Sequence, residues 1–343
     1  MPVRAGVRVR SGSSQGGVGR VRVSEMQRSR LLSAAVATVE ELGYARMTVA
    51  HVTARARVSR RTFYELFDNR EDCLLAVMQD TVGLIASELS AAGVDGLAWR
   101  ERVRAGLWQI LCFFDREPAL ARVCVVQSMR GGQRVLECRE EILARLAAII
   151  DEGRLESGRA AESPSLTAEG LVGAAVAILY KRLLMREREP LSGLLDPLMG
   201  MIVLPYLGPA AARRERRERR GTRTFSSGRK NPAGLKSPAR LADLSVEDPL
   251  AGVPMRLTYR TARVLEDVAE HPGVSNRLVA EHAGIADQGQ ASKLLARLER
   301  LGLLQNTGPG HARGERNAWS LTGLGERVTQ QLALSTDVQK DPA

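Results

Sequence analysis

The sequence predicts a mainly all-α protein. Apolar residues recur at helical spacing from residue 24 onward, and no strand-like alternation interrupts residues 92–208. Only two short runs near the C-terminal end, Leu303–Asn306 and Ala318–Leu321, are typical of strands. A chain of 343 residues is long enough for two or three domains. The predicted segments are an arm at 1–23, a helical domain at 24–74, a second helical domain at 75–208, a linker at 209–254, a third domain at 255–334 and a tail at 335–343.

Positive charge is concentrated in two of these segments. The formal net charge is +11, of which residues 1–23 carry +5 and residues 209–254 carry +6. Both tracts are too polar to form a core, so we expect a disordered basic arm and a flexible basic linker whose first part extends the preceding helix. Basic tracts beside folded modules favour a polyanionic partner, nucleic acid before membrane. The alternative for the arm is that translation starts near Met26.

Several classes of protein are excluded by what the sequence lacks. Its four histidines are scattered, and no phosphate-binding loop, dinucleotide turn or nucleophile elbow is present, so we expect neither an enzyme nor a cofactor. No apolar run approaches the roughly 18 residues of a membrane span, and no secretory signal is present, which predicts a cytoplasmic protein without a membrane partner. The cysteines show no zinc-type spacing and are expected to be reduced thiols without a metal; they are Cys73, Cys112, Cys124 and Cys138.

The first helical domain contains two short helices joined by a tight turn. A longer helix at 24–42 precedes them, with an apolar stripe of Leu32, Ala35, Val36 and Val39 and a stop at Gly43. Thr48 is suited to cap the first short helix and Ser59 the second. In the second, Phe63, Leu66 and Phe67 point inward at i, i+3 and i+4. The opposite face is predicted to carry Arg60, Arg61 and Tyr64, an arrangement suited to the major groove of DNA.

This stretch resembles the signature of the tetracycline-repressor (TetR) family. The matching residues are Val58-Ser-Arg-Arg-Thr-Phe-Tyr-Glu-Leu-Phe67, followed by Arg70-Glu-Asp-Cys-Leu74. The family usually has glycine in the turn, where this chain has Arg57, so we expect a slightly altered turn that costs roughly 1 kcal/mol. The resemblance implies DNA contacts in which Arg60, Arg61 and Thr62, after the cap Ser59, read bases. It implies phosphate contacts for Thr48, Tyr64 and Arg70.

The second helical domain is predicted to sense a ligand and to dimerise. Its expected helices are 70–91, 99–114, 119–129, 133–151, 166–188 and 191–207. The resemblance implies that the last two helices of two subunits form a four-helix interface; the alternative is an intramolecular core. It also implies a cavity for a small apolar or aromatic effector, for which the candidate lining residues are Met78, Trp108, Cys112, Phe113 and Met129.

The third domain follows the order helix, helix, helix, strand, loop, strand, helix, which is that of a winged helix. The predicted helix caps are Ser275, Asp287 and Thr322. Leu298-Glu-Arg-Leu-Gly-Leu-Leu304 and Trp319-Ser-Leu-Thr-Gly-Leu-Gly325 are similar to domains of the multiple-antibiotic-resistance-regulator (MarR) type. The candidate DNA contacts are Gln288, Gln290 and Lys293 on bases and Arg313 and Arg316 on phosphates. The alternative is a domain that mediates protein contacts, which its near-neutral net charge favours.

Together these features predict a homodimeric DNA-binding transcription regulator associated with the nucleoid. In this interpretation it is an effector-responsive repressor that binds double-stranded DNA through its TetR-like head and through a tethered winged helix. The rival hypothesis is an architectural DNA-binding protein that ignores sequence and is driven by the arginine-rich arm and linker. It predicts an affinity that collapses with salt.

Overall fold

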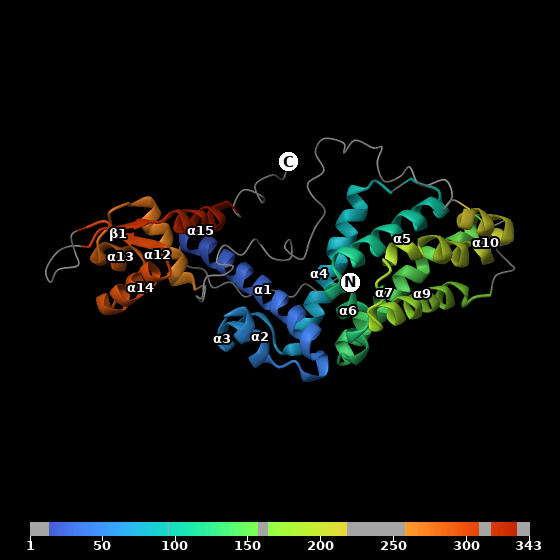
Figure 1. The fold of residues 1–343 in the computed structure, drawn as a ribbon, viewed down its shortest axis with the longest axis horizontal. Coiled ribbons are helices and arrows are strands. Elements are labelled where there is room, and N and C mark those ends of the chain that lie inside the picture. Colours follow the sequence, from blue (N-terminus) through green and yellow to red (C-terminus); the bar gives the residue numbers. More distant parts are fainter. Residues whose placement is uncertain (1–13, 95, 157–163, 218–257, 309–316, 335–343) are drawn as a thin grey trace. The chain divides into compact units, whose positions relative to one another are not determined.

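The computed structural model describes residues 14–94, 96–156, 164–217, 258–308 and 317–334. The chain divides into two compact units (Figure 1). The C-terminal unit comprises Met1–Arg30, Ala56–Thr62 and Ser245–Ala343, and the helical unit comprises Leu31–Arg55 and Phe63–Leu244.

Every regular element among the described residues up to 217 is a helix, as the sequence predicts. In chain order these are α1 (Ser14–Leu42), η1 (Tyr44–Arg46), α2 (Val49–Ala56), α3 (Arg60–Leu66), α4 (Arg70–Ala91), α5 (Trp99–Arg116), α6 (Pro118–Val125), η2 (Gln127–Arg130), α7 (Gln133–Asp151), α8 (Gly153–Glu156), α9 (Thr167–Leu184), η3 (Leu191–Leu194) and α10 (Leu195–Arg217).

The first helix begins earlier than predicted. Residues 14–23 were expected to be disordered but are the start of α1. The reason is that Val23 and Met26 are buried in the hydrophobic core of the C-terminal unit, so this part of the chain has a surface to pack against. From Leu31 onward, the predicted stripe of α1 is buried, and Gly43 ends the helix by donating to the Val39 carbonyl at 2.8 Å.

Two other predicted helices are shorter in the structure. The expected helix at 119–129 is divided into α6 and the 3₁₀ turn η2. Pro118 begins α6, because proline fits the first helical position. The expected helix at 166–188 ends as α9 at Leu184, after which Arg186 has a positive φ of 50°. A residue with a left-handed backbone interrupts helical hydrogen bonding, so the last turn does not form.

One hydrophobic core of the helical unit is built around Trp99. Its ring is buried, donates through Nε1 to the Ile149 carbonyl at 2.9 Å, and meets Tyr206 edge-on at 5.4 Å between centroids. Buried residues of α5, α7, α9 and α10 complete this cluster, including Val172 and Ile202. The helices predicted for ligand sensing and dimerisation therefore share one packed core.

The last helix of this unit continues past the predicted start of the linker at residue 209. Gly208 (φ 80°) bends α10, and the segment beyond it ends at Arg217. Glu215 in this segment is completely buried and is paired with Arg100 and with Arg104, whose Nη1 lies 2.6 Å from Glu215 Oε2. Arg104 also contacts Asp196 at 2.7 Å. The first residues of the predicted linker are thus an anchored part of the fold, as the helix-supporting Arg and Glu spacing indicated.

Replacing Glu215 with alanine should lower the free energy of unfolding by about 2 kcal/mol, because two arginine side chains lose their shared carboxylate. The value lies below the usual range for a fully buried pair because both arginines keep some solvent contact. The matched control is Glu141→Ala, which removes an exposed i,i+4 pair with Arg145 and should cost less than about 1 kcal/mol. Urea unfolding followed by circular dichroism measures both; equal effects would contradict the anchoring role.

Two helical segments are long and apolar enough to cross a membrane by length and composition alone, Arg70–Ala91 and Leu191–Glu215. This corrects the expectation that no stretch approaches that length. The core helices of soluble proteins pass the same test, so the finding is weak evidence for a membrane. Both segments contain buried residues that pack inside the protein, among them Leu74 and Val77 of the first and Met199 of the second.

All four cysteines are free thiols, as the sequence predicts. Burial raises the pKa of Cys112 and of Cys138, and it raises the pKa of Cys124 to about 12. A raised pKa disfavours the thiolate that reacts with oxidants and metals, which is the behaviour of structural cysteines.

The C-terminal unit has the predicted order of elements. These are α12 (Tyr259–Glu270), α13 (Asn276–His282), α14 (Gln288–Arg300), β1 (Leu304–Asn306), β2 (Trp319–Leu321) and α15 (Gly323–Leu334). The strands pair antiparallel with Gln305 opposite Ser320, and an isolated bridge joins Val274 to Trp319. The apolar faces of the helices meet the strands in one core that contains Val264, Leu265, Val268, Leu295, Leu298 and Trp319.

Candidate nucleic-acid interface

The starts of α2 and α3 are each fixed by a side-chain cap, and the sequence predicts both caps. Thr48 Oγ1 accepts from the His51 amide at 3.2 Å at the start of α2. Ser59 Oγ accepts from the Thr62 amide at 3.0 Å at the start of α3, and it also contacts the Thr62 hydroxyl at 2.9 Å. Each cap satisfies an amide that the first turn of a helix leaves without a partner, so α3 begins at a defined residue.

The two faces of α3 differ as predicted. Phe63 is completely buried and packs against Phe67 at 5.5 Å between centroids. Arg60 and Arg61 are exposed, and Tyr64 is 57% exposed. Thr62 and the cap Ser59 are half-buried. A short helix held by buried aromatic rings therefore presents two arginines and a tyrosine to solvent.

The backbone of the turn has the strain that the sequence predicts at Arg57. Its φ is 54°, in the left-handed region where glycine is less strained than other residues. The turn nevertheless forms, because Ala56 and Val58 on either side of Arg57 are buried. The strain is therefore compensated by packing beside it.

Arg70, proposed as a phosphate contact, makes a contact of a different kind. Its Nη1 donates to the Met47 carbonyl at 2.6 Å, and its guanidinium lies over the Tyr44 ring, 5.1 Å from the centroid. Burial raises the pKa of Tyr44, an effect that the charge of Arg70 partly offsets. Arg70 thus braces η1 against the start of α4, whereas Thr48 is exposed at the start of α2.

A second exposed helix face lies on α14 in the C-terminal unit. Asp287 caps this helix by accepting from the Gly289 amide at 2.8 Å, and Ala291, Leu295 and Leu298 are buried. Gln288, Gln290 and Lys293 are exposed, as predicted. Gln290 Oε1 accepts from Arg260 at 3.3 Å, so one of the three polar groups already has a partner on α12. Arg313 and Arg316 lie outside the described residues.

The five residues predicted to line an effector cavity differ in their exposure. Met78 and Phe113 are completely buried, whereas Trp108 is 47% and Met129 52% exposed, and Cys112 is half-buried. A cavity of about 490 Å³ lies between α7 and α9. Its lining is alanine and leucine with carboxylates; the residues are Glu140, Leu143, Ala144, Ala147, Ala148, Asp151, Ser165, Ala168, Glu169, Val172 and Gly173. The five predicted residues do not contribute to it.

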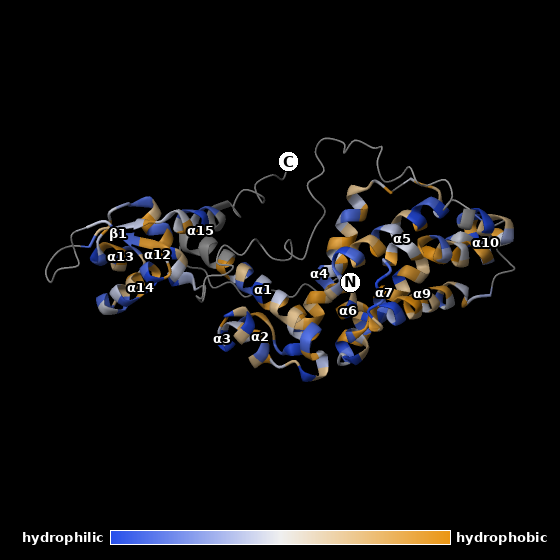
Figure 2. Ribbon diagram, in the orientation of Figure 1, coloured by the Kyte–Doolittle hydropathy of each residue, from blue (hydrophilic) through white to orange (hydrophobic). Residues whose placement is uncertain are grey.

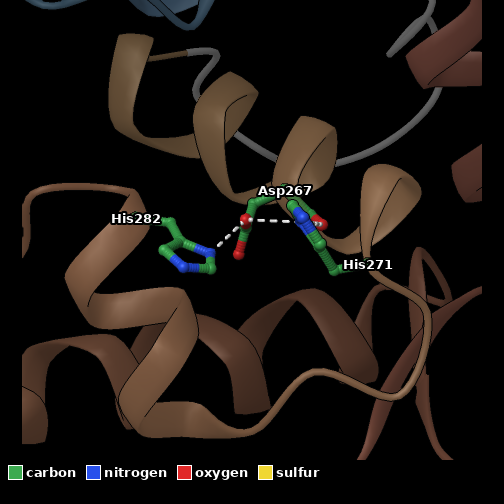
Figure 3. Close-up of side chains that lie close together, drawn as sticks. All are labelled: Asp267, His271 and His282. Carbon is green, nitrogen blue, oxygen red and sulfur yellow. Dashed lines mark hydrogen bonds and ion pairs between the residues drawn. The ribbon is translucent and has the colours of Figure 1, made fainter.

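Sequence analysis missed one cluster of functional groups. Asp267 on α12 and His271 at the C-terminal cap of that helix lie beside His282 at the end of α13 (Figure 3). The two histidines are eleven residues apart, a distance that matches no common metal motif, so the pattern drew no attention. The i, i+4 spacing of Asp267 and His271 is the one signal in the sequence from which these two members of the cluster could have been found.

The arrangement of α1 to α3 is that of a helix–turn–helix head, the class of domain that bacterial transcription regulators use on DNA. Residues 31–77 match the sequence family described as "Bacterial regulatory proteins, tetR family". This part of the chain is therefore a TetR-family N-terminal domain, in agreement with the resemblance of residues 58–74.

Individual proteins are similar to this chain at low sequence identity. The chain is 27% identical over 135 residues to the uncharacterized HTH-type transcriptional regulator Mb2274c of Mycobacterium bovis, covering 38% of this chain and 70% of that protein. Among solved structures, it is similar to the fatty acid degradation regulator FadR of Bacillus halodurans (18% identity, 51% of this chain and 94% of that one, TM-score 0.46). The FadR regulator of Bacillus subtilis in complex with stearoyl-CoA is similar at 18% identity, 51% and 96% coverage and a TM-score of 0.44.

Proposed function

We propose that this protein is a dimeric transcription regulator that acts as an effector-responsive repressor and binds DNA through α3. The observation that carries the proposal is the capped, aromatic-backed helix with Arg60, Arg61 and Tyr64 on its exposed face. Arginine forms paired hydrogen bonds with guanine in the major groove, and tyrosine and threonine hydroxyls bind phosphate oxygens. In this proposal Thr48 and Tyr64 position the helix, whereas Arg70 acts through the turn that it braces.

A homodimer is supported by the exposed faces of α9 and α10. Figure 2 shows much of α9 in the colour of hydrophobic residues. The exposed residues of α9 include Gly173, Ala174 and Ala177, which are small and allow close helix approach. Two large apolar side chains, Leu184 at the end of α9 and Leu204 on α10, are nearly half-exposed. A self-complementary patch of this kind forms a two-fold interface, and two copies of α3 then fit a palindromic site.

The effector site that we propose is the cavity between α7 and α9. Its lining combines the apolar side chains of Leu143 and Val172 with the carboxylates of Glu140 and Glu169. Such a lining suits a small molecule that has an apolar part and a positive charge, which adds a charge to the apolar or aromatic effector inferred from the sequence. Binding there acts on α9, one of the two helices of the proposed dimer interface.

A second DNA-reading surface is supported by α14 with its exposed Gln288 and Lys293. Glutamine pairs with adenine and lysine with guanine in the major groove. The competing proposal, that this domain mediates protein contacts, is favoured by its near-neutral charge. The protein would act in the cytoplasm at the nucleoid, where its DNA site is located.

Footprinting of the intact protein on DNA upstream of its own gene tests both surfaces together. We expect a two-fold symmetric protected site extended by flanking protection, because two readers on each of two chains give four contacts. The variant Gln288→Ala/Lys293→Ala should lose the flanking protection and keep the central site. A footprint unchanged in this variant would leave α14 without a DNA role.

The same experiment distinguishes the architectural alternative. A protein that ignores sequence protects no defined site, and its affinity falls steeply with salt on every DNA. Absence of a preferred site over the whole upstream region would contradict the proposed regulator.

A further inference from the structure

Three side chains of the C-terminal unit, on α12, its C-terminal cap and α13, lie close together. The carboxylate of Asp267 lies between two imidazoles, with Oδ1 2.7 Å from His282 Nδ1 and 3.2 Å from His271 Nδ1 (Figure 3). The three groups each place one potential ligand atom within 4.8 Å of the others. His271 Nδ1 also lies 3.3 Å from the Asp267 carbonyl oxygen, and the two rings are 5.3 Å apart.

The carboxylate itself is incompletely satisfied. Asp267 is only 5% exposed, and its Oδ2 is buried without a hydrogen-bond partner. A buried carboxylate oxygen without a partner is costly, and native proteins usually pair such an oxygen with a donor, water or an ion. The two histidines contact Oδ1, and the unpaired Oδ2 is a second, separate reason to expect a ligand at this position.

We propose that Asp267, His271 and His282 bind a divalent transition-metal ion of the zinc type. Two imidazole nitrogens and one carboxylate oxygen are ligands that zinc, cobalt and nickel accept, whereas calcium and magnesium require oxygen ligands. Ligand atoms around a tetrahedral zinc ion are about 3.3 Å apart, and Asp267 Oδ1 lies 2.7 and 3.2 Å from the two histidine nitrogens. Both histidines reach solvent, so water completes the coordination.

The proposed metal site lies between two helices of the C-terminal unit. Asp267 and His271 belong to α12 and its C-terminal cap, while His282 ends α13. A bound ion therefore ties the end of α13 to α12, at the start of the turn that leads to the α14 cap Asp287. Metal binding should stabilise the paired helices α13 and α14 whether or not α14 contacts DNA.

Cobalt binding to the full-length protein, purified without a histidine tag and freed of metal with a chelator, tests the proposal. We expect one Co²⁺ per chain with visible absorption of a low-coordinate site, displaced by Zn²⁺. Replacing either histidine, His271→Ala or His282→Ala, should weaken binding at least about 10-fold. Both side chains are partly exposed, so these variants keep the fold, which circular dichroism verifies. The matched control is His51→Ala, an exposed histidine of α2, which should bind cobalt as the parent does.

Two outcomes overturn the proposal. One is the absence of stoichiometric Co²⁺ and Zn²⁺ binding by the parent protein. The other is equal affinity in the parent and in both the His271 and the His282 variants, which would show an adventitious ion only. A zinc-dependent rise in melting temperature that both histidine variants abolish, and that His51→Ala keeps, supports the site independently of spectroscopy. None of these readouts involves DNA, so they are independent of the proposed function.

Discussion

Replacing Arg60 and Arg61 together with alanine should lower the affinity for the specific DNA site about 100-fold and should remove its preference over unrelated DNA. Each paired contact from an arginine to a base contributes about 1–3 kcal/mol of discrimination, so the loss of two such contacts gives this magnitude. The variant should fold normally, because both side chains are exposed while Phe63, which holds the helix, is unchanged. Fluorescence anisotropy with specific and scrambled duplexes at several salt concentrations measures both quantities.

The control for this experiment removes two positive charges from a surface outside α3. Arg213 and Arg214 are adjacent, exposed and located on α10, and their replacement by alanine should leave sequence preference intact. If the two double variants weaken binding equally and on all DNA, the α3 arginines act only as general positive charge. A change in the slope of log affinity against log salt would then identify phosphate contacts instead of base contacts.

The local chemistry of the helix ends explains why much of the fold is predictable from the sequence. Thr48, Ser59, Ser275 and Asp287 all cap the helices predicted for them, because capping depends on a side chain and an amide two or three residues away. The apolar face of α14 and the buried rings of α3 follow in the same way from helical periodicity.

The features that sequence analysis missed depend on partners far away in the chain. The start of α1 is ordered by a core contributed by residues beyond 258, and the buried Glu215 is recognisable only once α5 supplies Arg100 and Arg104. The cavity between α7 and α9 was missed for the same reason, because an apolar residue fills the core as readily as it lines a cavity, and Phe113, a predicted lining residue, is buried. Long-range packing decides between these outcomes, and periodicity does not encode it.

Two glycines at the start of α15, Gly323 and Gly325, allow the packing of this helix against β1 to be tested. Gly325 is buried, and a Cβ atom there would lie 2.1 Å from the backbone oxygen of Leu303 and 3.2 Å from Leu321 Cδ2. Real Cβ contacts are not this short, so the backbone must move. The Leu303 oxygen cannot retreat freely because it accepts from the Thr322 amide at 3.1 Å, next to the paired strands β1 and β2.

Gly325→Ala should therefore destabilise the C-terminal unit by about 3 kcal/mol, the upper part of the range for overpacking a close contact. Gly323→Ala is the matched control, because it is the same substitution two residues earlier, where a Cβ would meet only Arg327 Nη1 at 4.0 Å; its effect should stay within about 0.5 kcal/mol. Hydrogen exchange in peptides of α12 and α14 reports the stability of this unit separately from the helical unit. Equal exchange in the two variants would mean that α15 does not pack on β1 as closely as described, and the strand-and-helix arrangement that supports α14 would then be wrong.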